Sequence, residues 1–305
     1  MTDCKYWIAL EQAKGIGPAN LKLIYEKLKS FNLSAADLFS LTEREIKEEF
    51  SFHENINTAI ENSKNSIFKI EEDYHKLIDS DIEPILFFED SYPVRLHDIL
   101  KNTIPPILYS FGNKVILKEK GAAILGEKDL SEKGENIAFL GAKELAFHNI
   151  VTISGMARGV EIVHRSALLH NGKTIIVLPH GLYHLKIPQI LQDVFNTDNL
   201  IIVSPFYPSV ENSVYNAYIR NRLICALSHA VYIVECTVDG GIFEAAKSAN
   251  KLNIPLFVTE YKEYSDSASA NKELIDNGAY PVKGRLINKE LTPNLDELIG
   301  IVKFK

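Results

Sequence analysis

The stretch "VTISGMARGVEIVHRSALLHNGKTIIVLPHG" (residues 151–181) decides the fold. It begins as an apolar strand, breaks at Ser154 and Gly155, and resumes with the spacing of a helix that begins near Arg158. A turn of this kind, between a strand and a helix, leaves free backbone N–H groups and a positive helix end pointing to one place. We therefore expect the turn to bind an anion.

Short apolar runs rich in Ile and Val recur from about residue 112 onward, with helix-length amphipathic segments between them. Runs that are apolar on both faces indicate a parallel sheet covered by helices on both sides. We therefore predict a doubly wound, mostly parallel α/β fold, in which ligands bind beyond the carboxyl ends of the strands. The predicted strands are "GAAILG" (121–126), "IVTIS" (150–154), "TIIVLP" (174–179), "NLIIVSP" (199–205), "AVYIVE" (230–235) and "IPLFVTE" (254–260).

The first hundred residues have a different character, being acidic and helical in pattern. The segment "SAADLFSLTEREIKEEF" (34–50) offers Ser34 and Thr42 as helix caps. A Pro-punctuated stretch with one candidate strand, "PILFF" (84–88), follows the helical part. We predict a small helical domain over residues 1–75, a connector that docks on the sheet over 76–112, and the α/β domain over 113–305.

The bulk composition bounds the class of protein. A chain of 305 residues with 46% hydrophobic content can bury a sizeable core. We expect a cytoplasmic protein without membrane contact, because neither a signal peptide nor an apolar run of about 18 residues is apparent. Cys4, Cys225 and Cys236 are interpreted as buried thiols, because their spacing suggests neither disulfides nor zinc ligands.

The charge is unevenly distributed along the chain. Residues 1–110 carry 12 Lys and Arg against 19 Asp and Glu, whereas residues 111–305 carry 21 of each. A protein that binds nucleic acid without sequence preference normally presents a basic surface. The neutral C-terminal part permits a local basic groove but does not by itself indicate one.

Near the N-terminus, "LEQAKGIGPANLKLIYEKL" (10–28) places Gly15, Ile16 and Gly17 between two helical patterns. A Gly-x-Gly hairpin exposes backbone N–H groups at a helix start and can receive a phosphate of a nucleic-acid backbone. This arrangement resembles the helix-hairpin-helix motif. The alternative is a tight helix connection that serves packing only.

Two later segments could extend an anion site at the first turn. Arg158 would add a charge-assisted hydrogen bond to a phosphate that the backbone N–H groups of the turn already bind. "RNRLICALS" (220–228) puts two arginines before a buried helix, and "VDGGIFEAAKSA" (238–249) supplies a second Gly-rich turn, Asp239-Gly240-Gly241. Two such turns in one sheet could hold successive phosphates of a strand or those of a nucleotide.

In order and spacing, these segments resemble the DprA/Smf family of bacterial DNA-processing proteins. The family pattern has a Ser-Gly-x-Ala-Arg-Gly turn, an Arg-Asn-Arg segment and an Asn-x-Leu-Ile-x-x-Gly-Ala segment, the last matched by "NKELIDNGA" (271–279). A helix-hairpin-helix-like domain precedes the sheet in the family, and "SYPVRLHDI" (91–99) matches its Tyr-Pro segment. The resemblance implies a Rossmann-like sheet behind a small helical, SAM-like domain.

The chain also departs from the family pattern. Gly126-Glu127-Lys128 stands where the family has Gly-Ser-Arg, and "GLYHLKIP" (181–188) lacks the family's Asp. The segment between Arg158-Gly159 and His164-Arg165 is one residue shorter than in the family pattern. This shortening would rotate His164 and Arg165 by about 100° around the helix. Because the sequence ends at Lys305, soon after the predicted sheet, we expect no C-terminal winged-helix-like domain of the kind that many relatives have.

The resemblance implies a protein that binds single-stranded DNA and helps load a RecA-type recombinase during DNA uptake or recombination, without catalysis. It also implies a homodimer, and neither the resemblance nor the sequence suggests a cofactor or a metal. Tyr183 or Tyr218 could serve as a base-stacking platform; the alternative is a residue at the edge of the core, which is the more common place of a tyrosine. The predicted phosphate-binding residues are Gly126, Lys128, Ser154, Gly155, Ala157, Arg158, Gly159, Lys186, Arg220, Asn221, Arg222, Gly240 and Gly241, with Gly15, Ile16 and Gly17 in the helix-hairpin-helix turn.

A second hypothesis belongs to another class. Related sheets occur in lysine-decarboxylase-like nucleotide hydrolases and in nucleotide-sensing domains, whose Gly-Gly turn before a helix with a Glu resembles "DGGIFEAA" (239–246). On that interpretation Gly240, Gly241 and Glu244 would bind or cleave a nucleotide. The Arg-Asn-Arg segment favours DNA, whereas the neutral charge balance favours the nucleotide.

Overall fold

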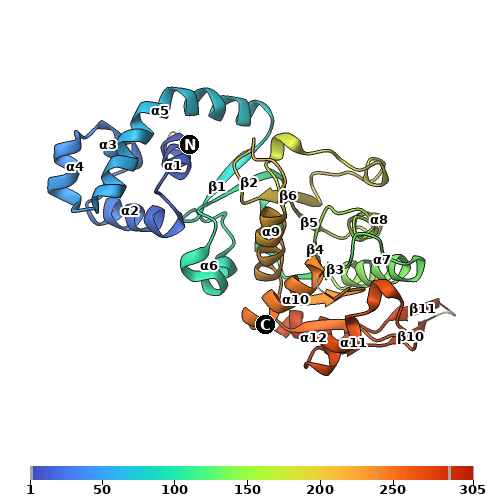
Figure 1. The fold of residues 1–305 in the computed structure, drawn as a ribbon. Coiled ribbons are helices and arrows are strands. Elements are labelled where there is room, and N and C mark those ends of the chain that lie inside the picture. The colour runs from blue at the N-terminus through green and yellow to red at the C-terminus, as the bar shows by residue number, and fades with distance from the viewer. Residues whose placement is uncertain (1–2, 239, 288–289, 305) are drawn as a thin grey trace. The chain divides into compact units, whose positions relative to one another are not determined.

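The computed structural model describes residues 3–238, 240–287 and 290–304. The chain divides into two compact units (Figure 1). Unit 1 comprises the residues up to Tyr92 together with Leu100–Leu108, and unit 2 comprises Pro93–Ile99 and the residues from Tyr109 onward. A separate connector over residues 76–112 stays a prediction.

Unit 1 is mainly helical, as expected from its sequence pattern. The proposed caps are confirmed: Ser34 and Thr42 each accept from a backbone N–H three residues on, and the acid at that position bonds back, which makes two capping boxes. The elements are α1 (Cys4–Gln12), α2 (Pro18–Ser30), α3 (Ala35–Ser40), α4 (Glu43–Phe50), α5 (Glu54–Asp79), β1 (Glu83–Leu86) and the short 3₁₀ helix η1 (Lys101–Thr103).

Unit 2 is built around a mostly parallel sheet, which confirms the predicted doubly wound fold. Its strands lie in the order β2-β6-β5-β4-β3-β7-β8-β9, and every neighbouring pair is parallel except β2 with β6. A separate antiparallel hairpin, β10–β11, follows the sheet in the chain. The strands are β2 (Ile107–Gly112), β3 (Gly121–Leu125), β4 (Val151–Gly155), β5 (Thr174–Val177), β6 (Leu200–Ser204), β7 (Ala230–Ile233), β8 (Leu256–Thr259), β9 (Tyr280–Val282), β10 (Gly284–Ile287) and β11 (Glu290–Pro293).

Helices cover both faces of this sheet (Figure 1). α7, α8 and α12 pack on one side, and α9 and α10 pack together on the other. The helices are α6 (Val94–Leu100), α7 (Glu132–Phe147), α8 (Ile162–Leu169), α9 (Val214–Leu227), α10 (Gly241–Lys251), α11 (Asn271–Asp276) and α12 (Asp296–Phe304), with 3₁₀ helices η2 (Lys114–Lys118), η3 (Leu182–His184), η4 (Gln189–Leu191) and η5 (Asp266–Ala268).

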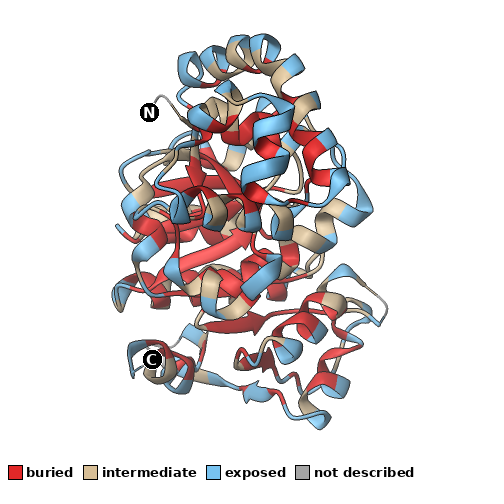
Figure 2. Cartoon of the chain, turned by 90° about the vertical axis from the view of Figure 1, so that its left-hand side faces the viewer, coloured by how far each residue is buried: buried red, intermediate tan, exposed pale blue. Residues whose placement is uncertain are grey.

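The central strands form the core of unit 2 because both of their faces are apolar. β3 to β8 are buried at every position, and Figure 2 shows them as continuous red ribbons. Each fully buried Val, Leu or Ile side chain contributes about 1.5 to 3 kcal/mol. The three cysteines are buried and free, as predicted, and burial raises the pKa of the Cys4 and Cys225 thiols to about 12.

Two details differ from expectation. The sequence pattern missed β2, β9 and the β10–β11 hairpin. β9 is a three-residue strand at the edge of the sheet, and the hairpin lies outside it, so neither is buried on both faces. β2 is buried at its first four positions, but it falls within the predicted connector. The helix predicted to begin near Arg158 begins at Ile162. Gly159 has a φ of +86°, a left-handed conformation that interrupts a right-handed helix, so residues 156–161 form a turn instead.

Within residues 3–238, 240–287 and 290–304, no helix is long and apolar enough to cross a membrane.

Candidate functional site

The sheet of unit 2 has a switch point between β3 and β7. From β3 the chain adds β4, β5 and β6 in one direction, and from β7 it adds β8 and β9 in the other. Where the strand order reverses, the loops at the carboxyl ends diverge and leave the crevice in which doubly wound folds bind ligands. The loops that follow β3, β4 and β7 are therefore the first place to look for a site.

The turn after β4 is pressed against the loop after β3. The Ser154 side chain is fully buried, and its hydroxyl donates to the Ile124 carbonyl at 2.7 Å, so it shapes the turn rather than the surface. A Cβ added at Gly159 would lie 2.8 Å from the Lys128 carbonyl oxygen. Gly159 is thus required both by its positive φ and by this close approach.

This turn presents free backbone donors. Val160 and Glu161 donate their N–H groups to the Ala157 carbonyl at 3.1 Å each. The N–H groups of Ala157, Arg158 and Gly159 have no hydrogen-bond partner in the part of the chain that the structure describes. Successive free N–H groups beside a left-handed residue make an anion-binding concavity. The turn, not the helix end, therefore supplies the predicted anion-binding amides.

Arg220, on α9, lies directly against this turn. A Cβ at Gly155 would overlap the Nη1 and Cζ atoms of the Arg220 guanidinium. Burial lowers the pKa of Arg220 to about 10, which leaves the group charged at neutral pH. Its Nε is buried without a hydrogen-bond partner among the described residues. Because an unsatisfied buried donor costs about 1 to 3 kcal/mol, an anion that accepts from this guanidinium would be stabilised.

A cavity of about 350 Å³ opens beside the turn and Arg220. This volume is at the lower end of small-ligand sites. Two imidazoles and one exposed lysine share the cavity with the buried guanidinium, so cations and donors outnumber acids along its wall. The lining residues are Met156, Ala157, Leu178, Pro179, His180, His184, Leu185, Lys186, Pro188, Asn212, Ala217 and Arg220.

The structure brings several of the predicted residues together around this cavity. Ala157, Lys186 and Arg220 line it, and Gly155 lies against the Arg220 guanidinium. Arg158 is exposed on the same turn. Lys128 is exposed on the loop that contacts Gly159 through its carbonyl.

Three other predicted residues do not line the cavity. Gly126 is buried, and a Cβ there would lie 2.7 Å from a methyl group of Leu130. Tyr183 and Tyr218, proposed as stacking platforms, are 41% and 40% exposed and do not line the cavity.

The second Gly-rich turn forms a neighbouring but distinct cluster. Asn221 is buried, and its side-chain amide donates to the Gly241 carbonyl at 3.0 Å, so it holds this turn to α9. Arg222 is half-buried and Gly241 is exposed. Asp239, the first residue of the predicted turn, lies outside the described residues.

The protein's own carboxylates occupy the anion positions at the switch point. Glu235 is fully buried and accepts from the Ser131 backbone N–H at 2.8 Å and from its hydroxyl at 2.5 Å, at the N-terminus of α7. Glu127 accepts from the Thr237 N–H at 3.1 Å and hydroxyl at 3.0 Å, in the loop after β7. Helix N-termini favour negative charge, and here a glutamate provides it where nucleotide-binding folds place a phosphate.

Neither His164 nor Arg165 lines the cavity, which agrees with the rotation expected from the shortened spacing. His164 is fully buried; its Nε2 donates to the Gly155 carbonyl at 2.9 Å, and its Nδ1 lies 2.6 Å from the Thr174 hydroxyl. Desolvation lowers the pKa of this imidazole to about 4. Arg165 pairs with Asp193 and donates to the Ile190 carbonyl at 2.6 Å. His164 therefore stabilises the turn through its hydrogen bond to the Gly155 carbonyl.

The Gly15–Gly17 turn belongs to unit 1. Gly15 has a φ of +101°, and its carbonyl accepts from the Asn20 side chain at 2.9 Å. Ile16 is buried, and its N–H donates to the Ala13 carbonyl. α2 begins with Pro18, which has no N–H, so this helix start offers one donor fewer than the sequence pattern implies.

Sequence reasoning left some cavity residues unassigned. The scattered histidines His180 and His184 are as consistent with a structural or solvated role as with a functional one, and Asn212 carries no motif signal. No local pattern could reveal them, because the cavity joins loops that are far apart in the chain. Among the residues the structure describes, no cluster of three or more His, Cys, Asp or Glu side chains could hold a metal ion.

The fold and the site together define a Rossmann-like α/β protein with a pocket lined by basic side chains, beside a switch point whose anion positions are filled by Glu127 and Glu235. The chain belongs to the family described as DNA recombination-mediator protein A, whose model matches residues 83–290. This result confirms the resemblance to the DprA/Smf family.

Individual relatives agree with this assignment. The Smf protein of Synechocystis is 28% identical over 285 residues, which are 90% of this chain and 69% of that protein. The DNA processing protein DprA of Streptococcus pneumoniae is 27% identical over 194 residues, 63% of this chain and 67% of that protein.

Two solved structures share the fold. The S. pneumoniae DprA structure has a TM-score of 0.73 at 20% identity and covers 91% of this chain and 94% of its own. The structure of DNA processing protein A of Helicobacter pylori has a TM-score of 0.58 at 25% identity, and the match covers 73% of this chain and 96% of that chain. The H. pylori protein is described as having a unique single-stranded DNA binding mode.

Gly159→Ala should destabilise the protein more than Gly278→Ala. Both glycines have positive φ, +86° and +99°, but only Gly159 would drive a Cβ into a backbone carbonyl, whereas Gly278 faces open space. We expect a loss of about 1 kcal/mol for Gly278→Ala and about 2 to 3 kcal/mol for Gly159→Ala in urea unfolding. Equal losses would show that the contact with Lys128 does not constrain the turn.

The buried His164 predicts an acid-dependent loss of stability. Its pKa is about 4 in the folded protein and near 6.5 in the unfolded chain, so the unfolded state binds more protons in that window. Stability is therefore full above pH 6.5 and falls towards pH 4. The stability difference between the wild type and His164→Asn should shrink by roughly 2 to 3 kcal/mol between pH 7.5 and 4.5. A constant difference would mean that His164 is not held neutral.

Proposed function

We propose that this protein binds single-stranded DNA through the cavity beside Arg220 and carries out no catalysis of its own. The observation that carries the proposal is the buried Arg220 guanidinium, which lacks a partner at Nε and lines a cavity next to three free amides. A phosphate offers several acceptors at once and suits both groups. Family membership and the H. pylori relative's description indicate which phosphate-bearing ligand to test first.

The arrangement of charge supports a strand of DNA rather than a lone ion. Lys186 lies at the cavity, and Arg158 and Lys128 are exposed on the loops beside it. These side chains could meet phosphates on either side of the one that Arg220 and the turn would hold. A backbone track of this kind needs no basic surface elsewhere, which agrees with the neutral overall charge of residues 111–305.

The nucleotide alternative has less support. Its proposed residues, Gly240, Gly241 and Glu244, lie at α10, where Glu244 pairs with Lys247 at 2.7 Å. Glu127 and Glu235 already supply negative charge to the neighbouring turn and to α7. A phosphate placed there would be repelled by carboxylates that are held in position.

By family membership, we further propose a role in DNA processing and homologous recombination in the cytoplasm, with DNA delivered to a RecA-type recombinase and the protein acting as a homodimer. The Gly15–Gly17 turn is proposed as a second phosphate contact. It is the weaker candidate, because Pro18 removes one of its donors.

Oligo-dT binding across a salt series tests the central proposal. The wild type should lose affinity as salt rises, with a logarithmic slope near 0.7 for each phosphate contact. Arg220→Gln removes one charge-assisted contact, so we expect about a tenfold weaker affinity and a slope lower by roughly 0.7. Fluorescence anisotropy of labelled oligo-dT measures both quantities.

Arg165→Gln is the matched control for this experiment. Arg165 is also an arginine in unit 2, but Asp193 and the Ile190 carbonyl hold it away from the cavity. Its replacement should leave oligo-dT affinity unchanged. If the wild type fails to bind oligo-dT at low salt while a nucleotide raises the melting temperature, the DNA proposal is wrong and the nucleotide alternative stands.

A further inference from the structure

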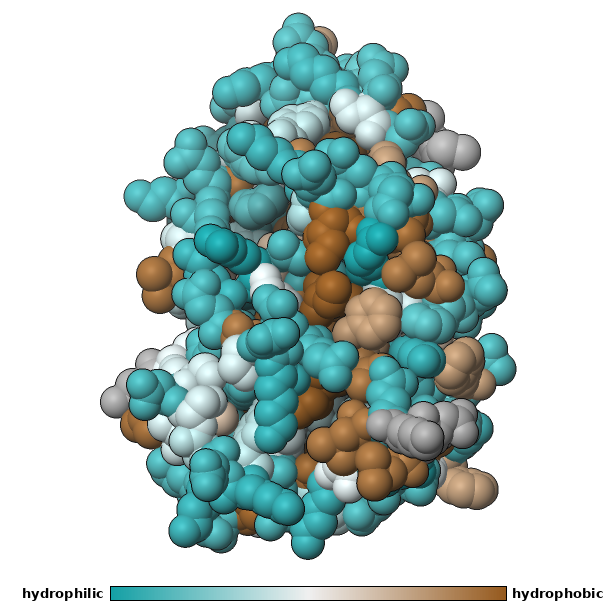
Figure 3. All heavy atoms as spheres, turned by 90° about the vertical axis from the view of Figure 1, so that its right-hand side faces the viewer, coloured by the Kyte–Doolittle hydropathy of each residue, from teal (hydrophilic) through white to brown (hydrophobic). Residues whose placement is uncertain are grey.

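A second and larger cavity, of about 790 Å³, lies at the carboxyl ends of β8 and β9 in unit 2. Its lining is mostly apolar and includes Ile137 of α7, Val282 of β9, and Leu286 and Leu291 of the β10–β11 hairpin. Figure 3 views the side of the molecule that carries this hairpin, and apolar side chains gather there in patches among hydrophilic ones. The volume lies within the range of small-molecule sites.

The deep polar groups of this cavity are already satisfied. The Tyr232 hydroxyl and the Thr259 hydroxyl, both of which line it, bond to each other at 2.8 Å. A ligand therefore needs no polar atom at this point, and an apolar group can cover the pair without leaving a buried donor unpaired. The chemistry of the interior favours an apolar body.

The charged residues of the lining are mainly basic. Three lysines, Lys133, Lys262 and Lys283, face one acid, Glu260, which Lys283 approaches at 3.5 Å. Lys133 stands over the Tyr261 ring, 4.8 Å from its centroid, and Lys262 is exposed and makes no ion pair with a described residue. Two cations are thus available to a negatively charged group.

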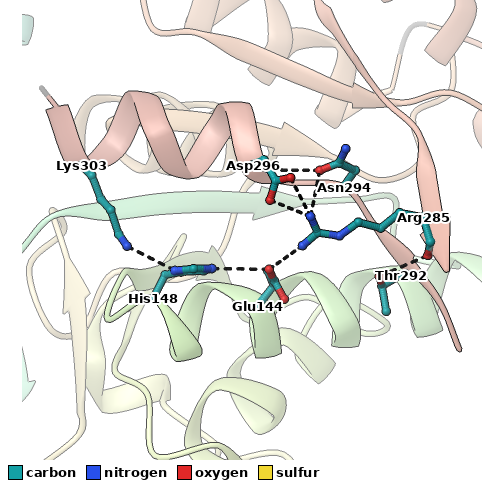
Figure 4. A network of polar contacts seen from close by, with 7 residues as sticks. All are labelled: Glu144, His148, Arg285, Thr292, Asn294, Asp296 and Lys303. Carbon is teal, nitrogen blue, oxygen red and sulfur yellow. Dashed lines mark hydrogen bonds and ion pairs between the residues drawn. The ribbon is translucent and has the colours of Figure 1, made fainter. Parts of the chain in front are cut away.

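The hairpin wall of the cavity is held in place by ion pairs. Arg285 donates to Asp296 of α12 at 2.7 Å and to Glu144 of α7 at 2.8 Å, and the network continues through His148 to Lys303 (Figure 4). Two helices of the same unit therefore fix the strand that carries Leu286. A preformed wall lowers the ordering cost of binding.

We propose that this cavity is a binding site for a small amphipathic anion, with its apolar body against Ile137, Leu286 and Leu291 and its negative group at Lys133 and Lys262. The site goes beyond the proposed function and is independent of it, because the two cavities share no lining residue. An extended DNA strand is a poor occupant, since the exposed leucines would face its phosphates.

The test uses the aromatic sulfonate probe anilinonaphthalene sulfonate, titrated into the folded, full-length protein. We expect saturable fluorescence enhancement with one site. Reversing the charge of both lysines, in the double variant Lys133→Glu with Lys262→Glu, should raise the dissociation constant of the probe about tenfold or more. Leu291→Gln changes an exposed lining residue and should raise it several-fold.

Matched controls separate this site from general electrostatics and from the Arg220 cavity. Lys118→Glu with Lys272→Glu reverses two exposed lysines outside the cavity and should leave probe affinity unchanged. Arg220→Gln should keep probe binding even if oligo-dT affinity falls. No saturable probe binding, equal affinity in the two double variants, or displacement of the probe by oligo-dT would each overturn the inference.

Discussion

The guanidinium of Arg220 lies buried against the backbone of Gly155, and the candidate site depends on this contact. A Cβ at residue 155 would displace the guanidinium, which fills that space. Partial burial shields the guanidinium from water and leaves its Nε without a partner in the described structure, so an anion gains more there than at the surface. β4 and α9 are packed on one another and hold the arginine beside the amides of Ala157 to Gly159.

At the switch point, the groups that attract an anion are already occupied by carboxylates of the chain itself. Helix α7 and the loop after β7 would each attract an anion, and Glu235 and Glu127 supply one from within the chain. The crevice that binds nucleotides in many doubly wound folds is therefore capped by side chains. The candidate site for a ligand lies instead at the next loop, after β4, where no carboxylate of a described residue bonds to the amides of Ala157, Arg158 and Gly159.

Much of this architecture could be predicted from the sequence, because buried parallel strands are apolar on both faces and stand out as runs of Ile and Val. The turn at residues 154–159 and the Arg-Asn-Arg segment could also be found, since each is local. The pocket partners His180, His184 and Asn212 could not, because only the tertiary fold brings them to Arg220. The later helix start, at Ile162, follows from the positive φ of Gly159. The sequence alone does not determine this angle, because glycine adopts positive and negative φ about equally readily.

The most direct test is a crystal structure of the protein with a short oligo-dT. We predict one phosphate within hydrogen-bonding distance of the Arg220 guanidinium and of at least one amide among Ala157, Arg158 and Gly159. Adjacent phosphates should approach Lys186 or Lys128. Oligonucleotide bound only at the Gly15–Gly17 turn, or at the Gly240–Gly241 turn with the Arg220 cavity empty, would contradict the account.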